Sequence, residues 1–425
     1  MTLHVIRPED TLYKLAKMYN TSTHRIIEDN GLSDPEHLVV GQVLVVLSDQ
    51  GYYTVQKGDS IYQIAKKLGI PYSSIMNENP QVRNYHFLMP GQQLQIPNSA
   101  SNHRILVNGY AYPWVELPVL RESLPHLTYV SIFSYEVNPD GSLTKIDDDA
   151  VLDEARAYGT APKMVITNII QGQGFDSDLA HSILTDENLQ DLLINNVLQI
   201  LEEKGYVGLD VDFEYLYPED RENYNNFLEK ISDVLKPAGY SLSTAIAPKT
   251  SAEQEGLLYE AHDYYAHGQL ADEVILMTYE WGYLYGPPRA VAPIDEVEKV
   301  LAYAVTEIPP EKILMGIPNY GYDWTLPYVE GTAAAVISNV EAIEIARENN
   351  AEIQYDETSQ APYFTYYDKE QQEHIVWFED ARSIQAKLEL VNKYGLGGIS
   401  YWTVNQSFPQ NWTVLSNEFQ TIKYA

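Results

Sequence analysis

The strongest constraint on the fold is an alternation of short β-prone runs with amphipathic helical stretches, which begins near residue 104 and continues toward the C-terminus. Such alternation predicts parallel strands that are joined by helical crossovers. Eight runs fit this pattern, at 105–110, 129–133, 164–168, 207–213, 241–247, 273–278, 313–317 and 398–402. Eight parallel strands with intervening helices are typical of a (β/α)8 barrel, an α/β fold whose functional residues lie at the C-terminal ends of the strands.

An open doubly wound sheet is the alternative, but no glycine-rich phosphate-binding loop follows the first run. The interval between the seventh and eighth runs is too long for a single helical crossover. It contains one helical pattern and further strand-like alternation, so we expect a small α+β insertion at about 324–378 that forms one wall of a cleft. A helix after this insertion then completes the barrel.

The N-terminal quarter contains an internal repeat, in which residues 4–47 align with residues 53–96. The matched positions include Asp10 with Asp59, Asn30 with Asn79 and Gly41 with Gly91. Each copy has a β run, an Asp-Thr or Asp-Ser N-cap, a helical pattern, a second short helix and a closing strand. The repeat therefore predicts two βααβ modules, at 1–48 and 52–98, followed by the barrel at 103–425.

Both copies resemble the LysM module, a family that binds N-acetylglucosamine-containing glycans such as peptidoglycan and chitin. The first copy departs from the pattern, with Pro8 and Glu9 where the second has Lys57 and Gly58. The resemblance implies that peptidoglycan, or another N-acetylglucosamine polymer, is a partner of this chain. Two weak sites on one chain increase retention on a polymer through effective concentration. The alternative is that the repeats only dimerise the enzyme or space it.

Composition excludes several other partners. Lysine and arginine total 27 against 60 aspartate and glutamate, a net charge of −33, which repels nucleic acid and anionic membranes. Cysteine is absent, which excludes disulfides, thiolate metal sites and a cysteine nucleophile. The N-terminus lacks a charged region followed by an apolar one, so we expect no cleaved signal peptide. We expect a monomer that binds neither nucleic acid nor membrane.

Three acidic residues occupy alternate positions of the fourth run, which reads GLDVDFEY at 208–215. Because side chains alternate along a strand, Asp210, Asp212 and Glu214 point to one face at intervals of about 6.6 Å. Like charges this close cannot all ionise without penalty, so at least one pKa should be raised. Glu214, at the mouth of the strand, is best placed to act as a protonated general acid. The alternative is a cation, arginine or metal site, although no histidine is near in sequence.

This segment is similar to the DxxDxDxE signature of glycoside hydrolase family 18, the chitinase-like barrels. The resemblance implies that Glu214 is the proton donor and that Asp212 orients the N-acetyl group of the substrate. The carbonyl oxygen of that group then attacks the anomeric carbon, so neither a cofactor nor a metal is implied. Asp210 would be the deep acid that hydrogen-bonds Asp212. The first acid of the signature is Val207 in this chain.

Further motifs of the family follow the sixth and seventh runs. The segment MTYE at 277–280 resembles Met-x-Tyr-Asp and implies that Tyr279 holds the acetamido oxygen. It also implies substrate contacts of Met277 and of Glu280, where glutamate replaces the usual aspartate. The segment GIPNYG at 316–321 resembles Gly-x-Pro-x-Tyr-Gly and implies substrate contacts of Asn319 and Tyr320.

Two aromatic residues end the first and last runs. Trp402 closes the eighth run and would form the floor under the sugar at the cleavage site, as the family resemblance implies. Tyr110 ends the first run, where lining the pocket and packing in the core are both open readings.

The third run departs from the chitinases, because it reads ITN at 166–168, followed by QGQGF at 171–175, instead of Ser-x-Gly-Gly. Together with the tandem repeats and VWFED at 376–380, this resembles the spore cortex-lytic N-acetylglucosaminidases of spore-forming bacteria. That resemblance implies retaining hydrolysis of cortex peptidoglycan during germination, at the cortex or coat boundary of the spore. The alternatives are a chitinase or chitooligosaccharide hydrolase, and a non-catalytic glycan-binding pseudo-glycosidase.

Overall fold

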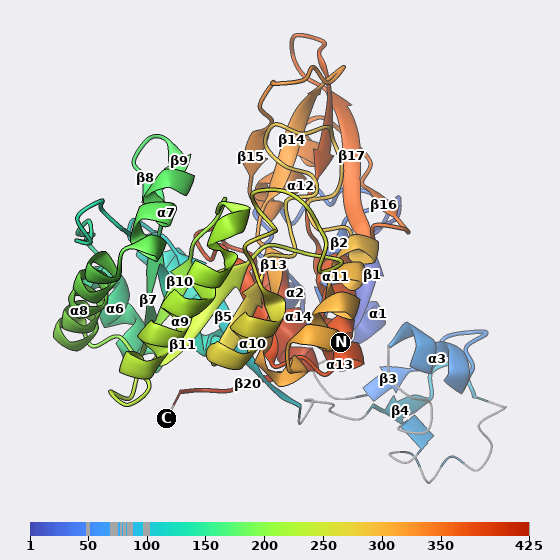
Figure 1. Cartoon of the computed structure of the whole chain (residues 1–425). Coiled ribbons are helices and arrows are strands. Elements are labelled where there is room, and N and C mark those ends of the chain that lie inside the picture. The colour runs from blue at the N-terminus through green and yellow to red at the C-terminus, as the bar shows by residue number, and fades with distance from the viewer. Residues whose placement is uncertain are drawn as a thin grey trace.

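The computed structural model describes residues 1–47, 52–68, 75–76, 79, 82, 88–96 and 103–424 (Figure 1). Eight parallel strands close into a barrel, because β19 pairs with β13 on one side and with β5 on the other. In spatial order the strands are β5 (Arg104–Ala111), β6 (Tyr129–Glu136), β7 (Ala161–Thr167), β10 (Gly208–Asp212), β11 (Ser241–Ile246), β12 (Glu273–Leu276), β13 (Ile313–Pro318) and β19 (Gly398–Trp402). The predicted (β/α)8 barrel and its eight runs are therefore confirmed.

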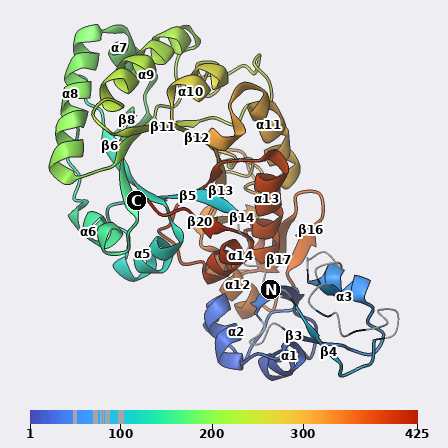
Figure 2. The same ribbon diagram turned by 90° about the horizontal axis from the view of Figure 1, so that it is seen from below.

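Helices surround the barrel, as the view from below shows (Figure 2). They are α5 (Leu117–Ser123), α6 (Asp149–Ala157), α7 (Ser177–Thr185), α8 (Glu187–Lys204), α9 (Arg221–Leu235), α10 (Tyr264–Leu270), α11 (Ile294–Glu307), α13 (Ala381–Tyr394) and α14 (Pro409–Glu418). The start of α13 shows why a helix begins there: Asp380 accepts hydrogen bonds from the backbone of Arg382 and Ser383. Within the described ranges, no helix is long and apolar enough to cross a membrane.

The core follows from the strand alternation. Odd-numbered residues of β10, such as Leu209 and Val211, are fully buried in the layer between the strands and the helices. Even-numbered residues therefore face the barrel interior, which a smaller apolar cluster fills. Its buried members are Tyr110, Phe133, Val165, Ala245, Ile275 and Leu314. The acids of β10 share this interior.

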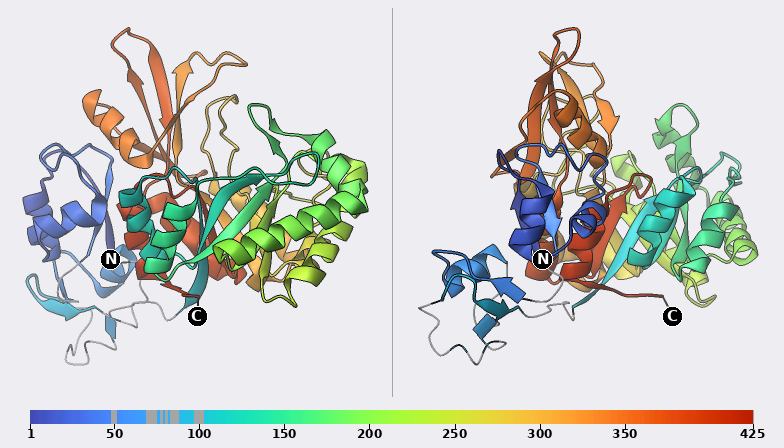
Figure 3. Two further views of the ribbon diagram at one scale, coloured as in Figure 1. Left: turned by 90° about the vertical axis from the view of Figure 1, so that its left-hand side faces the viewer. Right: turned by 180° about the vertical axis from the view of Figure 1, so that it is seen from behind.

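The segment between β13 and β19 is an α+β insertion, as predicted. It comprises β14 (Gly321–Leu326), β15 (Ala335–Ile337), α12 (Asn339–Glu348), β16 (Gln354–Asp356), β17 (Ala361–Tyr367) and β18 (Glu373–Trp377). Its antiparallel sheet has the order β15-β14-β18-β17-β16, and β14 begins three residues before the predicted boundary. A short hairpin of β8 (Ile169–Ile170) and β9 (Gly174–Phe175) rises from the same end of the barrel (Figure 3).

The first N-terminal module has the predicted βααβ order, with β1 (Thr2–Val5), α1 (Leu12–Tyr19), α2 (Thr23–Asn30) and β2 (Val43–Val46). The second contains β3 (Tyr52–Thr54), α3 (Ile61–Lys67) and β4 (Gln93–Gln95). Of its predicted second helix, only Ile75 and Met76 are described, and both are helical. The predicted linkers at 48–51 and 98–102 lie outside the described residues.

The repeated polar residues stabilise the modules themselves. Asp10 accepts a hydrogen bond from the Arg7 amide at 2.8 Å, and Asp59 accepts the equivalent bond from the Gln56 amide at 2.7 Å. The side-chain amide of Asn30 donates to two backbone carbonyls, one in α2 and one in β2, and Asn79 repeats this pattern. The residues that match between the two copies therefore reflect the shared fold of the modules.

The first module packs against both the barrel and the insertion. Gln410 of α14 donates to the Asn30 side chain at 2.9 Å, and Arg347 of α12 forms an ion pair with Asp34 at 3.2 Å. Val43 belongs to the barrel core, whereas Val39 belongs to the core of the insertion. The first module thus packs as part of the barrel and its insertion.

Because the first module packs against the insertion, a glycine-to-alanine substitution should affect stability differently at two matched positions of the repeat. Gly41 and Gly91 have φ values of +85° and +86°, so alanine strains both backbones alike. A Cβ at Gly41 would lie 1.8 Å from the carbonyl oxygen of Ile353, whereas a Cβ at Gly91 meets nothing within 4 Å. We expect Gly41→Ala to lower the free energy of unfolding of the barrel by about 2 kcal/mol more than Gly91→Ala.

Urea unfolding followed by tryptophan fluorescence measures this difference. All six tryptophans lie between residues 114 and 412, so the signal reports the barrel and its insertion. Equal midpoints for Gly41→Ala and Gly91→Ala would contradict a docked first module.

Candidate active site

Strand β10 carries its acids to the C-terminal end of the barrel. Asp210 is fully buried and Asp212 is 4% exposed, while Glu214 follows the strand and is half-buried. Because Leu209 and Val211 pack outward against the helices, the acids point inward. The structure therefore brings together the three carboxylates that the sequence predicts.

Asp210 is held from two other strands. The Tyr110 hydroxyl donates to Asp210 Oδ2 and the Ser243 hydroxyl donates to Asp210 Oδ1, each at 2.6 Å. Among the described residues, Asp210 is bonded by these two hydroxyls and not by Asp212, contrary to what the family resemblance implies. In the same described ranges, Asp212 Oδ1 is buried without a hydrogen-bond partner.

The acids keep protons at unusually high pH. Burial raises the pKa of Asp212 well above its usual value, and the negative charges of Glu214 and Asp210 raise it further. Burial also raises the pKa of Glu214 to about 8, with a further contribution from the charge of Glu280. Glu214 is therefore protonated at neutral pH, as a general acid must be.

Asp212 and Glu214 face a cleft of about 810 Å³. Asp212, Glu214 and Tyr279 line it, as do Tyr110, Met277, Glu280 and Trp402. The Trp402 ring meets the Phe133 ring edge to face, with 4.8 Å between centroids. Tyr110 packs in the apolar cluster of the barrel interior and also borders the cleft, and its hydroxyl donates to Asp210. An aromatic floor beside carboxyl groups suits the binding of a sugar ring.

Glu280 connects the cleft to the insertion. Its carboxylate accepts hydrogen bonds from the hydroxyls of Tyr320 and Tyr322, the latter at 3.0 Å. Tyr320 is 8% exposed and does not line the cleft, so its predicted substrate contact is replaced by a contact with Glu280. Glu280 thus lies between this tyrosine pair and Glu214.

The predicted substrate contact of Asn319 is corrected. Its side chain is 3% exposed and lies outside the cleft. Its amide donates to the carbonyl oxygens of Thr403 and Gln406, at 2.8 and 2.9 Å. Asn319 therefore stabilises the backbone that follows Trp402.

No residue of the predicted insertion at 324–378 is among those that line the cleft, so its role as a cleft wall stays a prediction. The insertion contacts the segment 280–286, because Trp324 donates from its indole nitrogen to the carbonyl oxygen of Gly286 at 2.9 Å. Cleft-lining residues come instead from the β8–β9 hairpin, from 248–259 and from 280–283.

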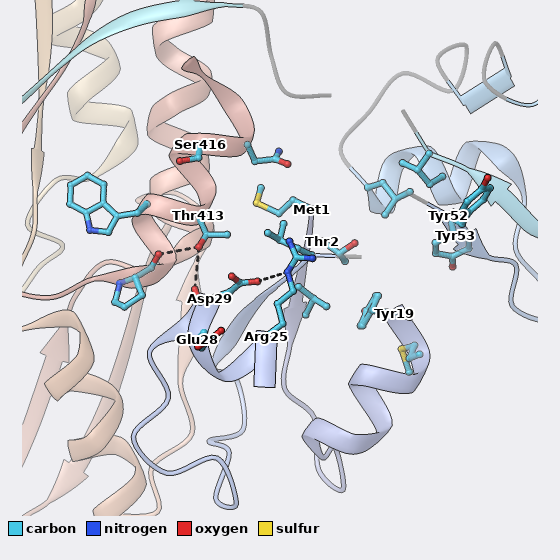
Figure 4. A pocket seen from close by; sticks show the side chains of 18 of the residues that line it. Met1, Thr2, Tyr19, Arg25, Glu28, Asp29, Tyr52, Tyr53, Thr413 and Ser416 are labelled. Atoms are coloured by element: carbon cyan, nitrogen blue, oxygen red, sulfur yellow. Dashed lines mark hydrogen bonds and ion pairs between the residues drawn. The ribbon is translucent and has the colours of Figure 1, made fainter. Parts of the chain in front are cut away.

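A second hollow, of about 660 Å³, lies between the two modules and α14 (Figure 4). Tyr19 and Tyr52 line it from the modules, and Thr413 lines it from α14. Arg25 pairs there with Asp29 at 3.4 Å. None of the acids of β10 lines this hollow, so it is distinct from the catalytic cleft. Among the described residues, no cluster of acidic and histidine side chains is arranged to hold a metal ion.

Comparisons with known proteins agree with this fold. The model of glycosyl hydrolases family 18 matches residues 109–407, and the LysM domain model matches residues 4–47 and 53–97. The cortical fragment-lytic enzyme of Bacillus subtilis (strain 168) is 43% identical over 430 residues, which cover 100% of this chain and 99% of that protein.

Two solved structures match along nearly the whole chain. The spore cortex-lytic enzyme SleL of Bacillus megaterium QM B1551 superposes with a TM-score of 0.89 at 39% identity, covering 100% of this chain and 99% of that one. The corresponding enzyme of Bacillus cereus superposes with a TM-score of 0.88 at 42% identity, covering 99% and 98%. The chain therefore belongs to glycosyl hydrolase family 18, as a glycoside hydrolase that carries two LysM modules.

Proposed function

We propose that this enzyme hydrolyses the β-1,4 bond that follows N-acetylglucosamine in fragments of spore cortex peptidoglycan. The observation that carries this proposal is a protonated Glu214 beside the unpartnered oxygen of Asp212, in an aromatic cleft. The full-length likeness to an enzyme named for cortical fragments supports this choice of substrate. We further propose that the protein resides in the spore, at the cortex or the coat boundary.

In the first step, Glu214 donates its proton to the glycosidic oxygen, and the bond from that oxygen to the anomeric carbon breaks. The acetamido oxygen of the same sugar forms a bond to the anomeric carbon, which gives a cyclic oxazolinium ion. Asp212 accepts a hydrogen bond from the acetamido N–H through its free oxygen. The Tyr279 hydroxyl donates to the acetamido oxygen, and Trp402 stacks under the ring.

In the second step, Glu214 is a carboxylate and removes a proton from water. The water oxygen bonds to the anomeric carbon as the acetamido oxygen leaves. Two successive displacements at one carbon retain the anomeric configuration. The nucleophile comes from the substrate. Asp212 and Asp210 therefore position the acetamido group and balance charge, and neither forms a covalent bond.

The two LysM modules keep the enzyme on its polymer. A module that remains bound while the barrel releases a product raises the local concentration of the next bond. Because the first module is docked on the barrel, glycan bound there would be held at a constant offset from the cleft.

Glu214→Gln tests the assignment of the acid. Glutamine keeps the shape of the side chain but donates no proton, so turnover of cortex fragments should fall about 100- to 10,000-fold. Release of reducing ends measures turnover, and calorimetry with the same fragments should show unchanged binding. Near-normal turnover would contradict the role of Glu214, and faster turnover of chitin oligosaccharides by the unaltered enzyme would contradict the cortical substrate.

Glu280→Gln tests the electrostatics of the cleft. The enzyme needs protonated Glu214, so activity is lost as pH rises through its pKa of about 8. Removing the negative charge of Glu280 lowers that pKa, and the basic limb of kcat/KM against pH should move to lower pH.

Glu296→Gln is the matched control for this shift. Glu296 lines the same cleft but forms ion pairs with Arg289 at 3.3 Å and Lys299 at 3.1 Å. Its substitution should leave the basic limb in place. A basic limb that stays in place in Glu280→Gln, or moves to higher pH, would refute the coupling.

A further inference from the structure

Asn168 directly follows β7 and binds the backbone of the proposed catalytic acid. Its side chain is 1% exposed. The amide Nδ2 donates to the carbonyl oxygen of Glu214 at 2.9 Å, and Oδ1 accepts from the backbone N–H of Glu214 at 2.9 Å. One side chain therefore satisfies both backbone polar groups of Glu214.

These two bonds replace strand pairing where the sheet ends. The ladder between β7 and β10 stops at the pair Thr167 and Asp212, two residues before Glu214. The chain then turns sharply, because Tyr215 has φ +56°, a conformation that persists in a residue with a side chain only when its surroundings impose it. Asn168 thus acts on the backbone between the end of the strand and this turn.

Asn168 is itself anchored. Its Nδ2 also donates to the carbonyl oxygen of Asp176 at 3.0 Å, and the backbone N–H of Asp176 donates to the carbonyl oxygen of Asn168 at 2.9 Å. Asp176 is the N-cap of α7. Asn168 therefore fixes the position of Glu214 relative to β7 and to the start of α7.

The other side of the same segment is held by His262, which lies in the loop before α10. His262 Nδ1 accepts from the backbone N–H of Ala247 at 2.9 Å, which leaves Nε2 to donate to the carbonyl oxygen of Phe213 at 2.9 Å. The backbone at 213–214 is therefore bonded from both sides, by Asn168 after β7 and by His262 before α10. Of these two side chains, Asn168 bonds Glu214 itself.

The chemistry of the contact requires a neutral amide. An amide offers a donor and an acceptor in one plane, whereas a carboxylate offers acceptors only and a hydroxyl cannot reach both groups at once. A charged side chain here would also change the ionisation of Glu214. The ITN segment at 166–168 thus provides a group that holds the acid without altering its charge.

We propose that Asn168 is a positioning residue for catalysis, which fixes the backbone of Glu214 so that its carboxyl group faces the glycosidic oxygen. This inference rests on the proposed role of Glu214 as the acid. Without the two hydrogen bonds from Asn168, the carboxyl group of Glu214 moves away from the buried position that raises its pKa. Loss of Asn168 therefore lowers both the rate and the pH at which activity declines.

Asn168→Ala tests the proposal against a matched control, Asn108→Ala. Asn108 is also 1% exposed, and its amide bonds Ser400 and Ser131 inside the barrel, away from Glu214. Both variants lose buried hydrogen bonds, so thermal unfolding should show a lower Tm for each. We expect kcat on cortex fragments to fall about 100-fold in Asn168→Ala, with little change in KM.

The pH profile separates positioning from a purely structural role. In Asn168→Ala the basic limb should move to lower pH, whereas in Asn108→Ala it should stay in place. Equal kcat and equal basic limbs for the two variants, per folded molecule, would overturn the inference.

Asn168→Asp keeps the test decisive if the alanine variant does not fold. Aspartate retains an acceptor for the Glu214 N–H but adds a negative charge, so kcat should fall while the basic limb moves to higher pH. An unchanged kcat per folded molecule would overturn the inference. Glu214→Gln, measured in parallel, separates the two proposals. An active Glu214→Gln variant would refute the assignment of the acid. An inactive Glu214→Gln variant together with a normally active Asn168→Ala variant would refute only the positioning role of Asn168.

Discussion

Three carboxyl groups on one face of β10, inside a barrel, are the constraint on which the site depends. Transfer of a carboxylate from water to a buried position is costly unless hydrogen bonds or opposite charges compensate it. Tyr110 and Ser243 provide hydrogen bonds to the deepest acid, Asp210. Below them, Lys163 forms a buried ion pair with Glu273 at 2.7 Å. Burial raises the pKa of Asp210, and the two hydrogen bonds and the positive charge of Lys163 limit this rise. Within the described residues no such compensation acts on the upper two acids, and burial raises the pKa of Asp212 well above its usual value and that of Glu214 to about 8.

The same electrostatics link the cleft to distant parts of the chain. Glu280 contributes to the raised pKa of Glu214, and Tyr322 of the insertion bonds Glu280. The insertion in turn contacts the first LysM module, where the backbone N–H of Ile353 donates to the carbonyl oxygen of Val40 at 3.0 Å. A glycan-binding module is therefore connected to the catalytic acid by a series of packed elements. The first LysM module and the barrel are therefore best described as one packed unit.

Sequence periodicity predicted the features that arise from local patterns. Alternation along β10 was sufficient to place Asp210, Asp212 and Glu214 on one face, and the repeat was sufficient to identify the two modules. The errors involve contacts between distant segments. Ser243 lies 33 residues from Asp210 and Asn168 lies 46 residues from Glu214, so no local pattern marks either bond. Asn319 was misassigned for the same reason, because the carbonyl groups that bind its side chain lie 84 and 87 residues away.

The central claim is that burial and a neighbouring charge keep Glu214 protonated to a pH near 8. A carbon-13 NMR titration of protein labelled at the glutamate side-chain carboxyl measures this ionisation without reference to activity. Comparison with Glu214→Gln assigns the resonance, because one signal disappears. We predict that this signal titrates with a pKa of about 8. A pKa near 4.3, the ordinary value of an exposed glutamate, would contradict the account.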